Sequence, residues 1–133
     1  MKKLIFASIV VLFFIACCAG AKTSPNAVQM GVDFAFSAKH KCSSVSPKIS
    51  VSNVPAGTKE LRVVLVDQDV PTWNHGGGTV PYTGSGVIPE GALKSGYNGP
   101  CPPSGSHTYE FKVKALDAQG VIIGVGSKTQ KFP

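Results

Sequence analysis

Hydrophobic and polar residues alternate along several short segments of the chain, with the period of two that is typical of β-strands. The alternation is clearest in residues 29–37 and 109–117, and residues 48–54 repeat it. Each of these segments should therefore form a strand with one face in the core and the other in solvent.

Other segments carry a different pattern. Residues 60–67 read ELRVVLVD, an apolar run of β-branched residues that predicts a central strand covered on both faces. Residues 121–125 predict a last apolar strand, and residues 127–132 a short edge strand. Residues 22–28 are polar and contain a proline, so we expect only a leader to the first strand. Residues 82–96 read as a loop.

Glycine and proline mark the intervals between these strands. Residues 55–58 (PAGT) and 118–120 (AQG) are turns by composition. No stretch after residue 21 shows the 3.6-residue period of an amphipathic helix. Many short strands separated by such turns predict an all-β protein, either a sandwich or an open barrel.

The first 21 residues have the layout of a secretory signal peptide. A pair of lysines precedes an apolar run of 12 residues, and the small residues Ala19, Gly20 and Ala21 offer a cleavage site. The apolar run is short for a membrane span. We therefore expect a signal peptide at residues 1–21 and one mature domain at residues 22–133, exported to the periplasm or secreted.

Two other interpretations of the leader remain open. Cleavage before Cys17 with lipidation would give an envelope lipoprotein. An uncleaved leader would act as an anchor. For the mature chain, membrane association is expected only through a lipid at Cys17.

Cleavage after Ala21 would leave two of the four cysteines, Cys42 and Cys101. An isolated pair in an exported protein is usually a disulfide. We predict this bridge, with two separate buried thiols as the alternative.

The basic residues exceed the acidic ones but are scattered. The net charge is +6, and loss of Lys2 and Lys3 with the leader lowers it to +4. The chain has no basic run with interleaved aromatic residues, the pattern typical of nucleic-acid binders. We expect solubility, some attraction for anions and no nucleic-acid partner.

Polar side chains that could carry chemistry fall at the predicted strand ends. Asp67 and Asp69 end one strand, and His107 and Tyr109 begin another; His75 comes just before three glycines. If these ends lie on one side, two carboxylates, two imidazoles and a phenol converge on a pocket. The imidazoles and the phenol would donate to phosphate or carboxylate oxygens, with the aspartates orienting the histidines. The glycines would form a backbone floor for an anion.

Each of these features also has a simpler interpretation. An aspartate pair at a strand end is common turn chemistry, and the HGGG sequence fits a tight bend or bulge. His107 fits a solvated loop residue equally well. We place His40 on the surface because lysines flank it, and we interpret Trp73 as a lid or core residue.

The order of short motifs is more informative than any one of them. The chain contains C-x-x-x-S-P, P-A-G-T-K, D-x-D-x-P, a following histidine, Y-x-G-P-C-P-P-x-G and H-x-Y, starting at Cys42, Pro55, Asp67, His75, Tyr97 and His107. This series resembles the phosphatidylethanolamine-binding protein (PEBP) family, most closely its bacterial Raf-kinase-inhibitor-like branch. The resemblance covers residues 34–117.

The resemblance implies an antiparallel β-sandwich, in a short version without the C-terminal helical part of larger members. It also implies a small pocket that takes anionic groups such as phosphate. Carried over by position, the residues lining this pocket would be Asp67, Asp69, His75, Pro100, His107 and Tyr109. Cys42 and Cys101 would lie near one another beside it. The glycines after His75 leave open whether that histidine reaches the pocket.

Three functions are compatible with these observations. The leading one is an exported, non-enzymatic protein that binds a small anion or a phosphate-bearing head group, without a cofactor. The second is a metal-dependent hydrolase, although the chain lacks an HExxH motif and an obvious nucleophile–base pair. Its metal ligands would be Asp67, Asp69, His75 and His107. The third is an interaction or inhibitor module with a vestigial pocket.

Overall fold

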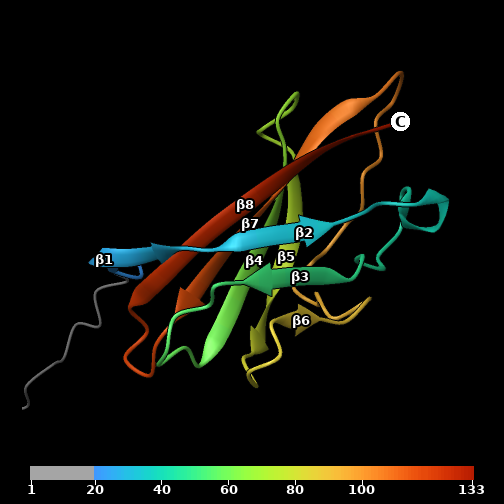
Figure 1. Cartoon of the computed structure of the whole chain (residues 1–133). Coiled ribbons are helices and arrows are strands. Elements are labelled where there is room, and N and C mark those ends of the chain that lie inside the picture. The colour runs from blue at the N-terminus through green and yellow to red at the C-terminus, as the bar shows by residue number, and fades with distance from the viewer. Residues whose placement is uncertain (1–19) are drawn as a thin grey trace, which may run out of the picture.

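Eight β-strands form two sheets in the computed structural model, which describes residues 20–133. The larger sheet has the order β1-β8-β7-β4-β5 and the smaller one β2-β3-β6. The strands are β1 Thr23–Gln29, β2 Gly31–Phe34, β3 Ile49–Ser52, β4 Glu60–Asp67, β5 Asn74–Pro81, β6 Val87–Ile88, β7 His107–Leu116 and β8 Ile122–Phe132. Figure 1 shows the smaller sheet lying across one face of the larger one.

The all-β sandwich predicted from the sequence is confirmed. Within residues 20–133 the one helical element is a single 3₁₀ turn, η1 (Ala38–His40). No helix of this part of the chain is long and apolar enough to cross a membrane. Most of the predicted signal peptide, including Cys17, lies outside the described residues, so its cleavage stays a prediction.

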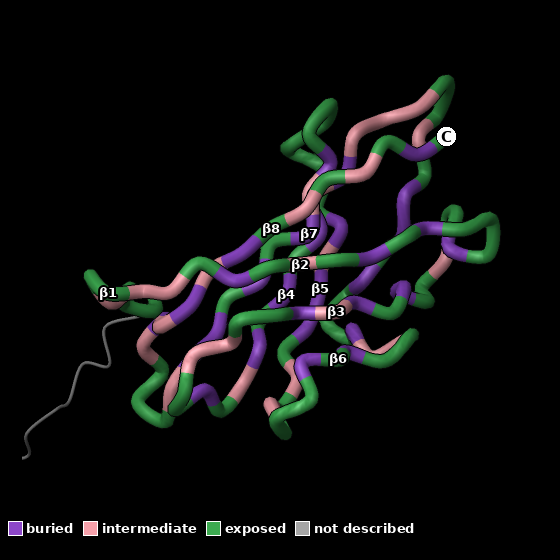
Figure 2. The backbone as a smooth tube through the Cα atoms, in the orientation of Figure 1, coloured by how far each residue is buried: buried purple, intermediate pink, exposed green. Residues whose placement is uncertain are grey.

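The core lies between the inner faces of the two sheets. Along β4 and β7 every second side chain is buried, as the alternating colours of Figure 2 show. Phe34 of β2 packs edge-on against Phe111 of β7, with ring centroids 4.8 Å apart. Burial of each large apolar side chain contributes roughly 1.5–3 kcal/mol. The periodic segments of the sequence therefore form the strands that build the core.

The expectation that β4 is covered on both faces is wrong. Leu61, Val63 and Leu65 are buried, whereas Arg62 is exposed and Val64 is 41% exposed. The smaller sheet covers only one face of the larger sheet, so the other face of β4 meets solvent (Figure 1).

Both ends of the described chain differ from the sequence prediction. Residues 23–29, expected as a leader, form β1, which pairs in parallel with β8, the one parallel pair among the described strands. The register shifts between Thr23 and Val28, so Pro25 falls where no regular ladder is needed. Residues 127–132 are not a separate strand, because β8 continues through them. The pairs of β1 with β8 end at Val125, so this part of β8 pairs with β7 alone and lies at the edge of the sheet, as expected.

The three glycines after His75 lie inside β5, at a bulge. The register of β4 against β5 shifts between Val64 and Val66. A Cβ atom on Gly77 would overlap the carbonyl oxygen of Val63, and one on Gly76 would overlap that of Gly96. Glycine is therefore required because the backbones approach closely, in agreement with the bulge interpretation.

The long loops are tied together by the predicted disulfide between Cys42 and Cys101, which is confirmed. Beside it, the backbone N–H of Cys42 donates to the carbonyl of Pro100 at 2.8 Å, and that of Gly99 donates to Ser43 at 2.7 Å. The segment that carries Cys101 is thereby fixed against residues 42–43.

His40 is buried, so its surface placement is wrong. Its Nδ1 accepts a hydrogen bond from the backbone N–H of Ser37 at 2.9 Å, and its ring lies 6.3 Å from that of Phe36. The flanking lysines remain exposed while the imidazole caps the turn.

Replacing Cys42 and Cys101 together by serine should lower the free energy of unfolding by about 4 kcal/mol, because the bridge closes a long loop of the unfolded chain. The sequence separation is 59. Urea denaturation of the oxidised protein and the double variant measures the difference. The difference should vanish when both proteins are unfolded in the presence of a reductant that opens the bridge of the wild type. Equal urea midpoints in oxidising buffer would contradict the prediction.

Candidate functional site

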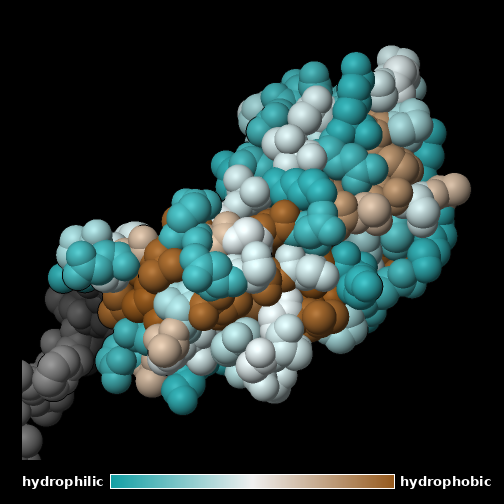
Figure 3. All heavy atoms as spheres, in the orientation of Figure 1, coloured by the Kyte–Doolittle hydropathy of each residue, from teal (hydrophilic) through white to brown (hydrophobic). Residues whose placement is uncertain are grey.

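The strand ends that carry the candidate residues lie at one end of the sandwich. β7 pairs with β4 in an antiparallel register that places Tyr109 opposite Asp67. β5 is antiparallel to β4 and begins at Asn74, so His75 starts beside the end of β4. This is the upper end of the molecule in Figure 1, and Figure 3 shows mostly hydrophilic residues there. The expected convergence of these strand ends is therefore present.

A cavity of about 260 Å³ opens at this end, and we refer to it as the strand-end cavity. It is lined by Asp67, Val70, Trp73, His75, Cys101, Pro103 and His107. Three of the six predicted pocket residues, two imidazoles and one carboxylate, are thus among its walls.

Asp67 is the centre of the polar network. Its side chain is buried, and one carboxylate oxygen, Oδ2, accepts a hydrogen bond from His107 Nδ1 at 2.7 Å. The other oxygen accepts the backbone N–H groups of Asp69 at 2.9 Å and Val70 at 3.2 Å. Burial acts to raise the pKa of Asp67, but these donors outweigh it and the pKa is lowered. A buried carboxylate is therefore held in its charged form.

His75 and His107 each have one ring nitrogen committed to an acceptor. Nδ1 of His75 lies 2.7 Å from the carbonyl oxygen of Asn98, and Nδ1 of His107 faces the Asp67 carboxylate. Carbonyl and carboxylate oxygens only accept, so both Nδ1 atoms carry protons. Nε2 of His75 lies 4.0 Å from Asp67 Oδ2. His75 therefore reaches the cavity despite the glycines that follow it.

Tyr109 is fully buried next to both imidazoles. Its ring centroid lies 5.4 Å from that of His75 and 6.2 Å from that of His107. Burial, with the charge of Asp67 added, raises the pKa of Tyr109 to about 12, so the phenol stays protonated at neutral pH. Its hydroxyl is buried beside Asp67 and the backbone of Cys101, and no hydrogen bond of good geometry reaches it within the described residues. Tyr109 does not line the strand-end cavity.

Asp69 and Pro100 do not line the strand-end cavity. Asp69 is exposed, and its Oδ2 accepts the backbone N–H of Thr108 at 2.6 Å. Pro100 is fully buried and supports the disulfide loop through its carbonyl. Asp69 nevertheless offers one carboxylate oxygen that, with ligand atoms of Asp67 and His107, lies in a group less than 4.8 Å across. Such a set could hold a metal ion, and His75 is not part of it.

The glycine run after His75 is not the floor of this cavity, so that expectation is wrong. Gly76, Gly77 and Gly78 line a different depression, on the outer face of the larger sheet. Their positions follow from the close packing of β5 against its neighbours.

Sequence reasoning did not place Val70 in the walls of the cavity. Val70 lies within the D-x-D-x-P motif, so the signal was continuity with residues already singled out. Cys101, expected beside the pocket, and Pro103 of the same P-C-P-P motif are also among the walls. Trp73, which also lines the cavity, is 65% exposed and therefore not a core residue.

The family model of the phosphatidylethanolamine-binding proteins matches residues 23–132. The chain belongs to this family. It is 33% identical to a UPF0098 protein of Methanothermobacter thermautotrophicus, over 56% of this chain and 62% of that protein. It is 34% identical to UPF0098 protein YbhB of Escherichia coli, over 63% of this chain and 67% of that protein. The match therefore spans less than two thirds of the archaeal relative.

Two solved structures share the fold of this PEBP-family chain. One is E. coli YbcL, described as a member of the mammalian PEBP family, with 23% identity, a TM-score of 0.61 and coverage of 77% of this chain and 97% of that one. The other is a putative PEBP homologue from Chlamydia trachomatis, with 25% identity, a TM-score of 0.57 and coverage of 81% and 98%.

In this PEBP-family chain, Asp67→Asn should lower stability most at neutral pH. A carboxylate with a lowered folded pKa stabilises the fold above its ordinary value of 3.8, and this contribution is lost as pH falls through the folded pKa. Urea unfolding should therefore separate the two proteins at about pH 7 and bring them together near about pH 2. Glu60→Gln, at a half-exposed pair with Arg62, is the control. The prediction would be contradicted if the free energies of unfolding of the wild type and Asp67→Asn differed by the same amount at both pH values.

Proposed function

We propose that this chain is a non-enzymatic binding protein for a small anion, such as phosphate or a phosphate-bearing head group. The observation that carries this proposal is the pair of imidazole Nε2 atoms at the strand-end cavity. His107 uses its Nδ1 for Asp67, which leaves Nε2 for a ligand, and His75 Nε2 lies 4.0 Å from Asp67 Oδ2. Each Nε2, once protonated, would donate to an oxygen of a phosphate.

Asp67 sets a condition on the ligand. Its negative charge would repel an anion, but its Oδ2 is occupied by the hydrogen bond from His107 Nδ1 at 2.7 Å. In a doubly protonated imidazole, Nε2 would donate to the ligand while Nδ1 keeps its hydrogen bond to Asp67. The anion therefore binds on the Nε2 side of His107, away from the carboxylate oxygens.

A binding role, as opposed to catalysis, is supported by the chemistry of the cavity walls. Among the described lining residues there is no serine or threonine, and the sulfur of Cys101 is committed to the disulfide. A hydroxyl or thiol nucleophile is thus missing from these walls.

Export is part of the proposal. A disulfide between Cys42 and Cys101 persists in oxidising compartments such as the periplasm or the extracellular space, and the leader has the sequence layout of a signal peptide. Mass spectrometry of the protein purified from its host should give the mass of residues 22–133 with one disulfide. An intact leader would contradict this prediction, and a lipid-modified Cys17 would assign the protein to the envelope lipoproteins.

His107→Ala should weaken the binding of inorganic phosphate by about tenfold or more, because it removes one charge-assisted hydrogen bond. Isothermal titration calorimetry measures the affinity. Lys131→Ala removes an exposed cation opposite the start of β7 and serves as the control for general charge, with affinity expected to be unchanged. Equal phosphate affinity of wild type and His107→Ala would remove His107 from the site.

The same titration tests the second candidate, a metal site formed by Asp67, Asp69 and His107. Two carboxylates and an imidazole would suit a divalent transition metal. If the site works by direct donors, phosphate affinity should be the same before and after dialysis against EDTA. Loss of binding in EDTA with recovery on adding Zn²⁺ would favour the metal.

A further inference from the structure

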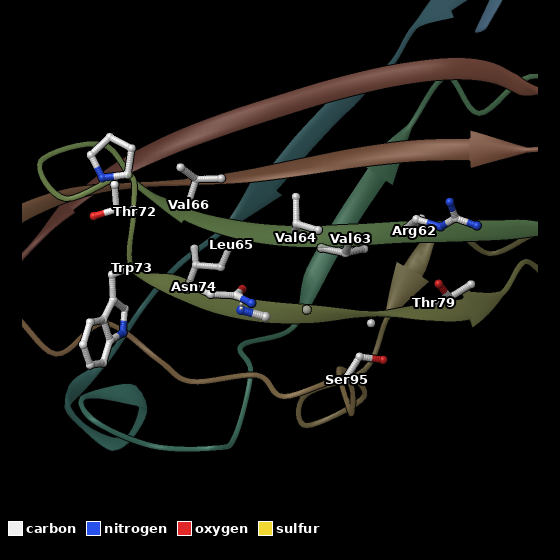
Figure 4. A pocket seen from close by; sticks show the side chains of 14 residues that line it. Arg62, Val63, Val64, Leu65, Val66, Thr72, Trp73, Asn74, Thr79 and Ser95 are labelled. Atoms are coloured by element: carbon white, nitrogen blue, oxygen red, sulfur yellow. Dashed lines mark hydrogen bonds between the residues drawn. The ribbon is translucent and has the colours of Figure 1, made fainter. Parts of the chain in front are cut away.

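A second depression, larger than the strand-end cavity, lies on the solvent face of the larger sheet, and we refer to it as the outer groove. Its volume is about 440 Å³, and it runs over β4 and β5. Figure 4 shows Trp73 at one end of it and Arg62 at the other. It lies on the face of the sheet that β2, β3 and β6 leave uncovered.

The outer groove exists because β5 has no side chains along part of its length. Gly76, Gly77 and Gly78 line it, so the valines of the neighbouring strand are left unshielded. Val64 is 41% exposed and Val66 is half-buried beside it. In Figure 4 Val64 and Val66 project from the same side of β4, opposite to Val63. The result is an apolar floor in a part of the surface that normally carries polar residues.

Neutral polar side chains border this floor. Asn74, Thr79 and Ser95 line the groove, and its one charged lining residue among residues 20–133 is Arg62. No acidic side chain lines it in that range. The chemistry therefore suits a ligand that offers hydrogen-bonding groups on one side and apolar groups on the other, and that is neutral or anionic. Arg62 and Val66 are four residues apart on a strand, roughly 13 Å, the length of four residues of an extended chain.

Trp73 lines both the outer groove and the strand-end cavity. Its side chain is 65% exposed, so neither depression buries it alone. A ligand that occupies the strand-end cavity and continues past Trp73 would therefore enter the groove. Trp73 is also the single tryptophan of the chain, so its fluorescence reports on this junction.

We propose that the outer groove is a subsite for an extended peptide segment whose anionic group occupies the strand-end cavity. This rests on the proposed function, because the anion anchors the segment. Backbone amides of an extended peptide would pair with Asn74, Thr79 and Ser95, while alternate side chains would cover Val64 and Val66. An alkyl chain would cover the valines but leave the polar border unpaired.

The test uses three probes in calorimetry and in Trp73 fluorescence. Inorganic phosphate is the first. The other two are capped pentapeptides that carry a phosphoserine at the N-terminal or the C-terminal position, with alternating threonine and valine elsewhere. One peptide should bind about tenfold tighter than phosphate and shift the Trp73 emission to shorter wavelength, since it covers the indole.

Val64→Thr separates the groove from the cavity. The change keeps the β-branched shape and replaces one methyl group of the floor by a hydroxyl, so peptide affinity should fall about fourfold while phosphate affinity is unchanged. Val87→Thr is the matched control, because Val87 is 48% exposed on β6 of the other sheet. It should change neither affinity.

The outcomes distinguish this inference from the proposed function. If phosphate binds and neither peptide binds more tightly, the peptide subsite is overturned and the anion site stands. If dodecyl phosphate gains affinity that Val64→Thr reduces, while the peptides gain none, the occupant is an alkyl chain and the peptide is excluded. If neither phosphate nor the peptides bind, both proposals are overturned.

Discussion

The pairing of β4 with β7 is the constraint on which the rest of the structure depends. The two strands keep one register over the whole of β4, from Glu60 opposite Leu116 to Asp67 opposite Tyr109. Because side chains alternate between the faces of a sheet, a slip of one residue would turn Leu61, Val63 and Leu65 out of the core. The same slip would move the Asp67 carboxylate away from the strand-end cavity. The core packing that fixes the register therefore also fixes the site.

Burial of the Asp67 carboxylate is tolerated because it has donors on both oxygens. Two backbone N–H groups and one imidazole satisfy it. A buried charge without such partners would be strongly unfavourable. The network that makes the carboxylate acceptable is also the one that orients His107. Stability and the proposed ligand binding would thus be coupled through the side chain of Asp67.

The sequence predicted the parts of the fold whose cause is local. Alternation over 109–117 and the polar residues that end the strand at Asp67 gave the correct strands and the correct convergence of their ends. Two features depended on contacts distant in sequence and were not predictable. Residues 23–29 form a strand because they pair with β8, and β4 meets solvent on one face because the second sheet covers only the other. The burial of His40 has a local cause, since its imidazole caps its own turn although lysines flank it.

The glycine run after His75 has a different role from the one expected of it, because its cause is backbone packing. These glycines do not line the strand-end cavity. They let β5 approach residues 93–96, where Gly77 exchanges backbone hydrogen bonds with Ser95 at 3.2 and 3.0 Å. That contact brings Asn98 within 2.7 Å of His75 Nδ1, which fixes the ring beside Asp67. Because these glycines lack side chains, β5 can approach the segment that holds the His75 ring. Their lack of side chains also leaves Val64 and Val66 of β4 uncovered on the outer face of the sheet.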